Sequence, residues 1–168
     1  LAYAWGQVDG AAAAGWALEH ADPALRTRAL SNAAATWAQA DPKALADWLP
    51  AQVEPDEPAY LALHVALAAH WASESPESAG AWASAIVQPE IRDTTLATFA
   101  SSLAVEQPPR ALEWANSIRN EEKRLDTTVD IYETWLEENL EAGRAALIAY
   151  LPRITDPQER QSLYALLH

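Results

Sequence analysis

Three arginines and a tyrosine recur at matching positions of this sequence, and their side chains could bind a carboxylate. Arg26, Arg92 and Arg124 each stand 11 residues before a large apolar residue of a periodic series, and Tyr60 holds that place in another copy. Eleven residues make about three helical turns, which puts each side chain near the apolar stripe at the far end of its helix. Stacked guanidinium groups would hold a carboxylate or an acidic peptide through charge-assisted hydrogen bonds. We therefore name Arg26, Tyr60, Arg92 and Arg124 as candidate partner-binding residues.

The same arginines have a structural alternative. Each guanidinium could pair with an Asp or Glu of its own or the adjacent repeat, while its aliphatic stem covers apolar surface. Arg92 with Asp126 and Arg124 with Glu90 are examples of such pairs. The chain has 24 acidic residues against 11 basic ones, so this pairing is the favoured interpretation. Exposure of the arginines would instead indicate a binding row.

Other reactive side chains give no catalytic or metal-binding pattern. His64 and His70 are six residues apart, so they do not share a helix face. His64 falls in the apolar stripe of its helix and is predicted to be a core histidine. The absence of cysteine excludes disulfides and thiolate metal sites, and there is no nucleophile elbow or glycine-rich phosphate loop. We expect no catalytic residue, metal or cofactor, and we expect the chain not to be an enzyme.

The tryptophans form two series with a common period. The first series is Trp5, Trp37, Trp71, Leu103 and Trp135, with a spacing of about 32–34 residues between successive members. The second series follows it by 11 residues and is Trp16, Trp48, Trp82 and Trp114, with Ala146 in the last copy. Such self-similarity is typical of solenoids, in which each repeat buries its apolar face against its neighbours. Every contact between repeats needs a buried side chain, so core tryptophans should recur in each repeat. An aromatic groove for a proline-rich peptide or a sugar would need tryptophans in only one or two repeats. A core role is therefore favoured, with Trp37, Trp71 and Trp135 largely buried, Trp48, Trp82 and Trp114 mostly so, and Leu103 in the core.

Capping residues and prolines divide the chain into helix pairs. Asp41-Pro42 and Ser75-Pro76 follow a first-series tryptophan, and Asp or Ser before Pro is typical of a helix start. Longer helices are predicted near 23–40, 58–73, 91–106 and 122–138. Shorter ones are predicted near 10–20, 42–49, 76–87, 108–118 and 140–151, with a last helix near 157–167. Pro50, Pro89 and Pro152 are predicted to stop three of the shorter helices.

Composition narrows the class of protein and of partner. Half of the residues are hydrophobic and only five are glycine, which favours an all-α fold. A net charge of −13 would repel nucleic acid and suits a basic protein segment better, although acidic helix surfaces are also common without any such partner. No run approaches the ~20 apolar residues of a membrane span. The absence of cysteine is compatible with location in a bacterial cytoplasm or in a periplasm and does not decide between them. The repeats predict one solenoid domain over residues 1–168. The absence of methionine, even at position 1, suggests that this domain comes from a longer protein.

Helix pairs with a period of about 32–34 residues, with Trp, small residues and a Pro at the junctions, resemble the tetratricopeptide-repeat-like α-solenoids over nearly the whole chain. Ala79 and Ala111 supply small residues in the second helices, whereas Ala38 and Ala72 follow the tryptophan without the Gly-x-x-Tyr of the usual repeat. The resemblance implies an all-α, right-handed α-solenoid of about five antiparallel helix pairs. It also implies a non-catalytic interaction module whose concave groove is lined mainly by the first helices.

Three functions fit this description. The first is a scaffold that binds a protein or peptide partner through the solenoid surface. The second is a helical structural arm that frames a catalytic domain in a larger bacterial enzyme, for example one acting on the cell wall. The third is a spacer or oligomerisation surface. An appended catalytic motif in the full-length sequence would favour the second function, and a membrane or signalling segment would favour the first.

Overall fold

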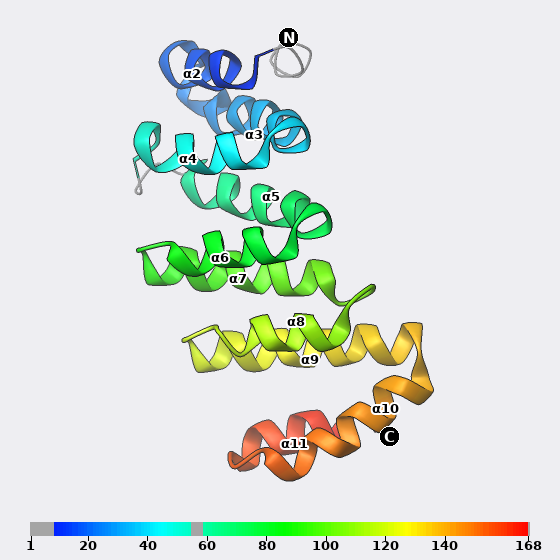
Figure 1. Cartoon of the computed structure of the whole chain (residues 1–168). Helices are drawn as coiled ribbons and strands as arrows, with labels where there is room; N and C mark the ends of the chain where they lie inside the picture. The colour runs from blue at the N-terminus through cyan, green and yellow to red at the C-terminus, as the bar shows by residue number, and fades with distance from the viewer. Residues whose placement is uncertain (1–8, 55–58, 168) are drawn as a thin grey trace. The chain divides into compact units, whose positions relative to one another are not determined.

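The computed structural model describes residues 9–54 and 59–167, without the side chains of residues 23 and 24. Trp5 and His168 lie outside these residues. The described residues form helices and short connections, with no strand among them (Figure 1). The α-helices are α2 (Gly10–His20), α3 (Pro23–Ala40), α4 (Pro42–Gln52), α5 (Ala59–Glu74), α6 (Pro76–Ala85), α7 (Pro89–Leu103), α8 (Pro108–Ala115), α9 (Glu121–Glu138), α10 (Leu140–Tyr150) and α11 (Pro157–Ala165), and a 3-10 turn, η1 (Leu151–Arg153), follows α10. The all-α prediction is confirmed for this part of the chain.

One junction residue recurs before the shorter helices with nearly the same backbone conformation. It lies four residues after each first-series position and is Asp9, Asp41, Ser75, Gln107 or Asn139. The φ angles of these five residues lie between −153° and −138°, and their ψ angles between 54° and 92°. At Asp41, Ser75, Gln107 and Asn139 the N–H of the junction residue donates to the carbonyl of the first-series residue, at 2.8 to 3.1 Å.

The same residue often caps the next helix. The side chains of Asp9 and Asp41 accept from the backbone N–H three residues on, each at 2.9 Å. Asn139 does the same at 3.0 Å. These bonds satisfy helix N-terminal donors that would otherwise lack partners. One residue therefore ends a long helix and starts a short one.

The proline predictions need correction. Pro50 does not stop α4, which continues to Gln52. At this place proline removes only the hydrogen bond to the Ala46 carbonyl, and the Val53 N–H still donates to Leu49 at 3.0 Å. Pro89 is not a stop but the first residue of α7, where its missing N–H is not needed. Pro152 follows the end of α10 and lies in the 3-10 turn, as predicted for a proline that ends the helix.

Several helices are shorter than predicted. α6 ends at Ala85 rather than 87, which leaves a connection of residues 86–88 before α7. α7 ends at Leu103, three residues early, and α8 ends at Ala115 instead of 118. The bounds of α2 and α3 match the prediction.

The chain divides into two compact units, 1–95 and 96–168, with the boundary inside α7. In the first unit α3 packs against α2, α4 and α5, and α5 packs against α3, α4 and α6. In the second unit α9 packs against α8, α10 and α11. Each of these long helices therefore contacts the short helices that precede and follow it, and α3 also contacts the next long helix. No helix of residues 9–54 and 59–167 is long and apolar enough to cross a membrane.

The two aromatic series meet across the helical hairpins. Trp37 and Trp71 are 9% and 7% exposed and Leu103 is 2% exposed, which confirms their predicted burial. The ring centroids of Trp37 and Trp48 lie 5.6 Å apart, and those of Trp71 and Trp82 lie 5.9 Å apart. In the second series Trp48, Trp82 and Trp114 are only partly buried, and Trp16 is exposed. Trp135 is also partly buried, less than predicted, because Ala146 leaves no second-series ring to cover it.

Candidate functional site

The structure shows local contacts of Arg92 and Arg124. Arg92 is 4% exposed, and its Nε donates to the adjacent Asp93 Oδ1 at 3.0 Å. Arg92 Nη2 forms an ion pair with the same oxygen. Arg124 is partly buried, and its Nη1 donates to the Ile118 carbonyl at 3.0 Å. Arg26 is partly buried on α3. Arg92 therefore has the buried pairing of the structural alternative, although its partner is its neighbour on the same helix.

Arg124 also lines a hollow of about 550 Å³ in the second unit. The same hollow is lined by the carboxyl groups of Glu121, Glu122, Asp156 and Glu159. One guanidinium among four carboxyl groups does not attract an acidic ligand. This hollow therefore does not support the predicted binding of an acidic peptide.

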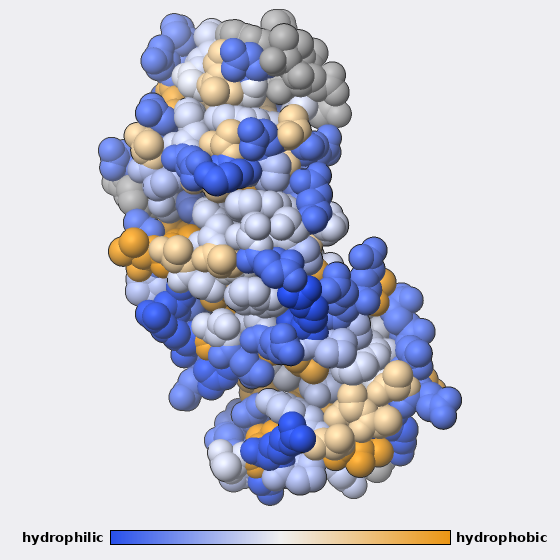
Figure 2. Space-filling model, viewed as in Figure 1, coloured by the Kyte–Doolittle hydropathy of each residue, from blue (hydrophilic) through white to orange (hydrophobic). Residues whose placement is uncertain are grey.

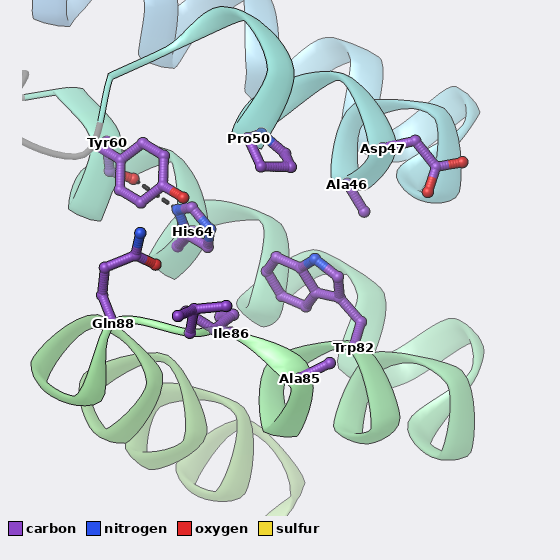
Figure 3. Close-up of a pocket in the computed structure, with 10 residues that line it drawn as sticks. Ala46, Asp47, Pro50, Tyr60, His64, Trp82, Ala85, Ile86 and Gln88 are labelled. Atoms are coloured by element: carbon purple, nitrogen blue, oxygen red, sulfur yellow. Dashed lines mark hydrogen bonds between the residues drawn. The ribbon is translucent and has the colours of Figure 1, made fainter.

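Tyr60, the fourth predicted residue, is 3% exposed and lines a different cavity of about 430 Å³ in the first unit. We call this cavity the α4–α6 pocket. Three segments form it, namely the end of α4, the start of α5, and α6 with its connection to α7 (Figure 3). Its lining residues are Ala46, Asp47, Pro50, Tyr60, His64, Trp82, Ala85, Ile86, Val87 and Gln88. The volume falls in the range of about 300–1,000 Å³ that is common for ligand pockets.

His64 is the polar group at the centre of the pocket. Its ring lies between Tyr60 and Trp82 (Figure 3), with centroid distances of 4.4 Å and 5.5 Å. The Trp82 and His64 rings are stacked, with 10° between their planes. His64 is 3% exposed, which confirms the predicted core histidine. Its contact with the pocket and with Trp82 was not predicted.

The protonation of His64 follows from its hydrogen bond. Nδ1 lies 2.8 Å from the Tyr60 carbonyl oxygen. A carbonyl can only accept, so Nδ1 carries the hydrogen and Nε2 of the neutral ring is an acceptor. Burial lowers the pKa of His64, and the hydrogen bond to Tyr60 opposes this in part. Burial also raises the pKa of the Tyr60 phenol. Both side chains are therefore neutral at pH 7.

The rim of the pocket is apolar on one side and acidic on the other. Val87 is 86% exposed, and Figure 2 shows hydrophobic side chains gathered where α6 leads into α7. Asp47 is exposed, and its Oδ2 accepts from Lys43 Nζ at 2.6 Å. Such exposed ion pairs contribute little to stability. The Asp47 carboxylate therefore needs little energy to change partners.

The pocket offers aromatic faces, one neutral acceptor and one carboxylate, which is a set of groups for binding. Among the described residues, no group of three or more His, Cys, Asp or Glu side chains could hold a metal ion. The sequence signal for the site is weak, since His64 occupies a stripe position where other copies carry Leu30 and Leu96.

Comparison with known proteins gives no relative: no family model, curated protein or solved structure matches the chain. Its function is therefore inferred from its own residues.

Proposed function

We propose that this chain is a non-catalytic scaffold that binds a protein or peptide partner. We further propose that its hairpins form a right-handed α-solenoid with a period of about 32–34 residues, similar to tetratricopeptide-like repeats. The observation that carries the proposal is the junction residue, which recurs five times with similar backbone angles. Recurring units that contact their nearest neighbours are the basis of solenoid architecture. The packing of α3 against α5 supports the same arrangement.

The α4–α6 pocket supports the binding role. It takes residues from α4 of one hairpin and from α5 and α6 of the next, so it depends on two consecutive repeats. Solenoids commonly bind partners over surfaces of this kind. A pocket that accepts one anchoring side chain would supply a large share of the binding energy, because a few buried residues dominate most interfaces.

The chemistry of the lining favours binding over covalent catalysis. The lining residues that the structure describes supply one imidazole and one carboxyl group, and none of them is Ser, Thr, Cys or Lys. His64 Nδ1 is bonded to a backbone carbonyl, and its ring is stacked on Trp82. Nucleophilic catalysis would need a hydroxyl, thiol or amine that such a base activates. The hydroxyl that these residues do supply, the Tyr60 phenol, has its pKa raised by burial, which disfavours the reactive phenolate.

Photocrosslinking tests the proposed function. A photoreactive amino acid replaces Val87, at the pocket rim, in cells of the native source. The control carries it at Val105, which is 57% exposed and outside the pocket lining. We expect a discrete crosslinked protein from position 87 and none of that size from position 105. Equal products from both positions, or none from either, would contradict a scaffold that binds through this pocket.

A further inference from the structure

We propose that the α4–α6 pocket recognises an arginine side chain of a basic partner peptide, with the guanidinium donating to His64 Nε2 and stacking on the adjoining rings. The inference rests on the proposed scaffold function and names the chemistry of its partner.

The hydrogen-bond acceptor is the first support. His64 is 3% exposed, and its Nδ1 is already committed to the Tyr60 carbonyl. No described residue donates to Nε2, and His64 is part of the pocket lining. Nε2 is not among the buried polar atoms that lack a partner, so it is open to the pocket. An apolar ligand that displaced water from Nε2 would leave this acceptor without a donor, which is unfavourable. A ligand that brings an N–H donor into the pocket therefore gains more than one that brings only apolar surface.

The ring faces are the second support. Tyr60 and Trp82 lie on either side of His64, and all three rings contribute to the lining (Figure 3). A guanidinium is planar, weakly hydrated and rich in donors, so it can stack on an aromatic face while it donates in its own plane. The aliphatic stem of the same arginine would cover the exposed Val87 and its neighbour Ile86.

Charge is the third support. Among the described residues that line the pocket, Asp47 is the only charged side chain. Residues 1–95 contain 12 acidic and 4 basic residues, a net charge of −8. Two of the four basic residues already pair with carboxylates, Lys43 with Asp47 and Arg92 with Asp93. The field of this unit therefore attracts a basic peptide and repels carboxylate or phosphate groups.

An arginine fits these features better than a neutral aromatic side chain. A tryptophan could donate one N–H to His64, but it would gain nothing from Asp47 or from the charge of the unit. A lysine would gain from the charge, but its ammonium is strongly hydrated and cannot stack. The guanidinium is the group that uses the acceptor, the rings and the carboxylate together.

Nuclear magnetic resonance of the full chain tests the proposal. The protein, labelled with ¹⁵N at its histidines and tryptophans, is titrated with three small probes. They are N-acetyl-arginine methylamide, its uncharged isostere N-acetyl-citrulline methylamide, and N-acetyl-tryptophan methylamide. We expect the arginine probe to shift the His64 Nε2 and Trp82 indole signals saturably, with an affinity about tenfold above that of the citrulline probe. Signals of Trp114 and Trp135, outside this pocket, should not move.

Two variants separate the contributions. His64→Phe keeps a ring but removes the acceptor, and it should weaken the arginine probe about tenfold. Asp47→Asn removes the carboxylate from an exposed position and should weaken the arginine probe without changing the citrulline probe. It keeps the test valid if His64→Phe fails to fold.

Three results would overturn the assignment: citrulline binding as tightly as arginine, preferred binding of the tryptophan probe, or no shift with any probe. The Val87 crosslink decides the scaffold function separately. A selective crosslink without arginine binding would leave a scaffold whose partner has different chemistry.

Discussion

The hairpins α5–α6 and α9–α10 have junction residues of the same backbone conformation, but different side chains pack between their helices. Ser75 and Asn139 have φ, ψ angles of −150°, 80° and −150°, 86°. In the first hairpin Trp82 from the second helix packs on Trp71. In the second hairpin Ala146 stands at the place of Trp82. There Tyr132, from the first helix, stacks on Trp135 at 6.2 Å with 11° between the rings.

The difference is an exchange of a large and a small residue. Three residues before the first-series tryptophan, α5 has Ala68 and α9 has Tyr132. The large ring thus moves from the second helix to the first, which keeps the total side-chain volume similar. The exchange leaves Trp135 partly buried, beside a hollow of about 230 Å³ that Ala146 also lines. The junction residue thus determines the backbone conformation between the two helices. The positions of the aromatic side chains determine which rings are exposed and where a hollow remains.

The largest difference between the hairpins should come from deleting the first-series rings. We expect Trp71→Ala to lower the free energy of unfolding by about 3–5 kcal/mol, the range for a buried aromatic. Trp135→Ala should cost roughly half as much, because its ring is partly exposed. Urea denaturation followed by circular dichroism measures both. Trp16→Ala, at a ring that is 45% exposed, is the control and should cost under about 1 kcal/mol. Equal costs for Trp71 and Trp135 would refute the packing difference.

The volume exchange can be tested by restoring it. Tyr132→Ala removes a 2% exposed ring and should be strongly destabilising. Adding Ala146→Trp restores the α5–α6 pattern in α9–α10 and should recover stability. In a double-mutant cycle of unfolding free energies we expect a favourable coupling of at least about 1 kcal/mol. Strict additivity would show that the two positions do not share one space.

The second unit should be sensitive to alkali through Tyr132. Burial, with the nearby Tyr150 phenol, raises the pKa of Tyr132 to about 12, and Arg153 opposes the shift. The folded phenol then keeps its proton where an unfolded tyrosine loses it, so stability should fall as the pH rises from about 10 to about 12. Tyr132→Phe should flatten this dependence in urea titrations. A loss of stability as steep as in the wild type would mean that another group causes it.

The first unit should lose stability in acid rather than in alkali, and the loss should be smaller. Burial lowers the pKa of His64, so its stabilising effect is complete above the unfolded value near 6.5. On acidification, unfolded chains bind a proton that the folded ring resists, and stability falls until the lowered folded pKa is reached. His64→Phe should reduce the change in urea midpoint between pH 7 and pH 5.

Much of the fold was predictable because its signals are local. Caps and prolines next to the first-series residues gave the bounds of α2 and α3. Periodicity gave the burial of Trp37, Trp71 and Leu103. The error at Pro50 arose because a proline in a last turn removes only one hydrogen bond, so its effect depends on how far the helix still has to run.

The candidate site was less predictable because distant segments form it. Residues 86–88 line the α4–α6 pocket, yet residues 86 and 87 were predicted to be helical. The burial of His64 was predicted, whereas its stacking on Trp82, which belongs to the following helix, depends on the packing of α5 against α6. Arg92 bonds its own neighbour, Asp93, whereas the example that the sequence suggested was Asp126.

Duplication of one repeat tests the proposed solenoid most directly. A second copy of the segment from Pro76 to Gln107 is inserted after Gln107, so that the chain passes from junction to junction. In a solenoid every helix keeps the same kind of neighbours. We expect a monodisperse protein with the same helicity per residue and a larger hydrodynamic radius than the original chain. It should unfold cooperatively, with a midpoint temperature at least as high as that of the original chain. Loss of cooperative unfolding or of helicity would contradict the repeat architecture, because a bundle with fixed partners cannot accept the extra pair.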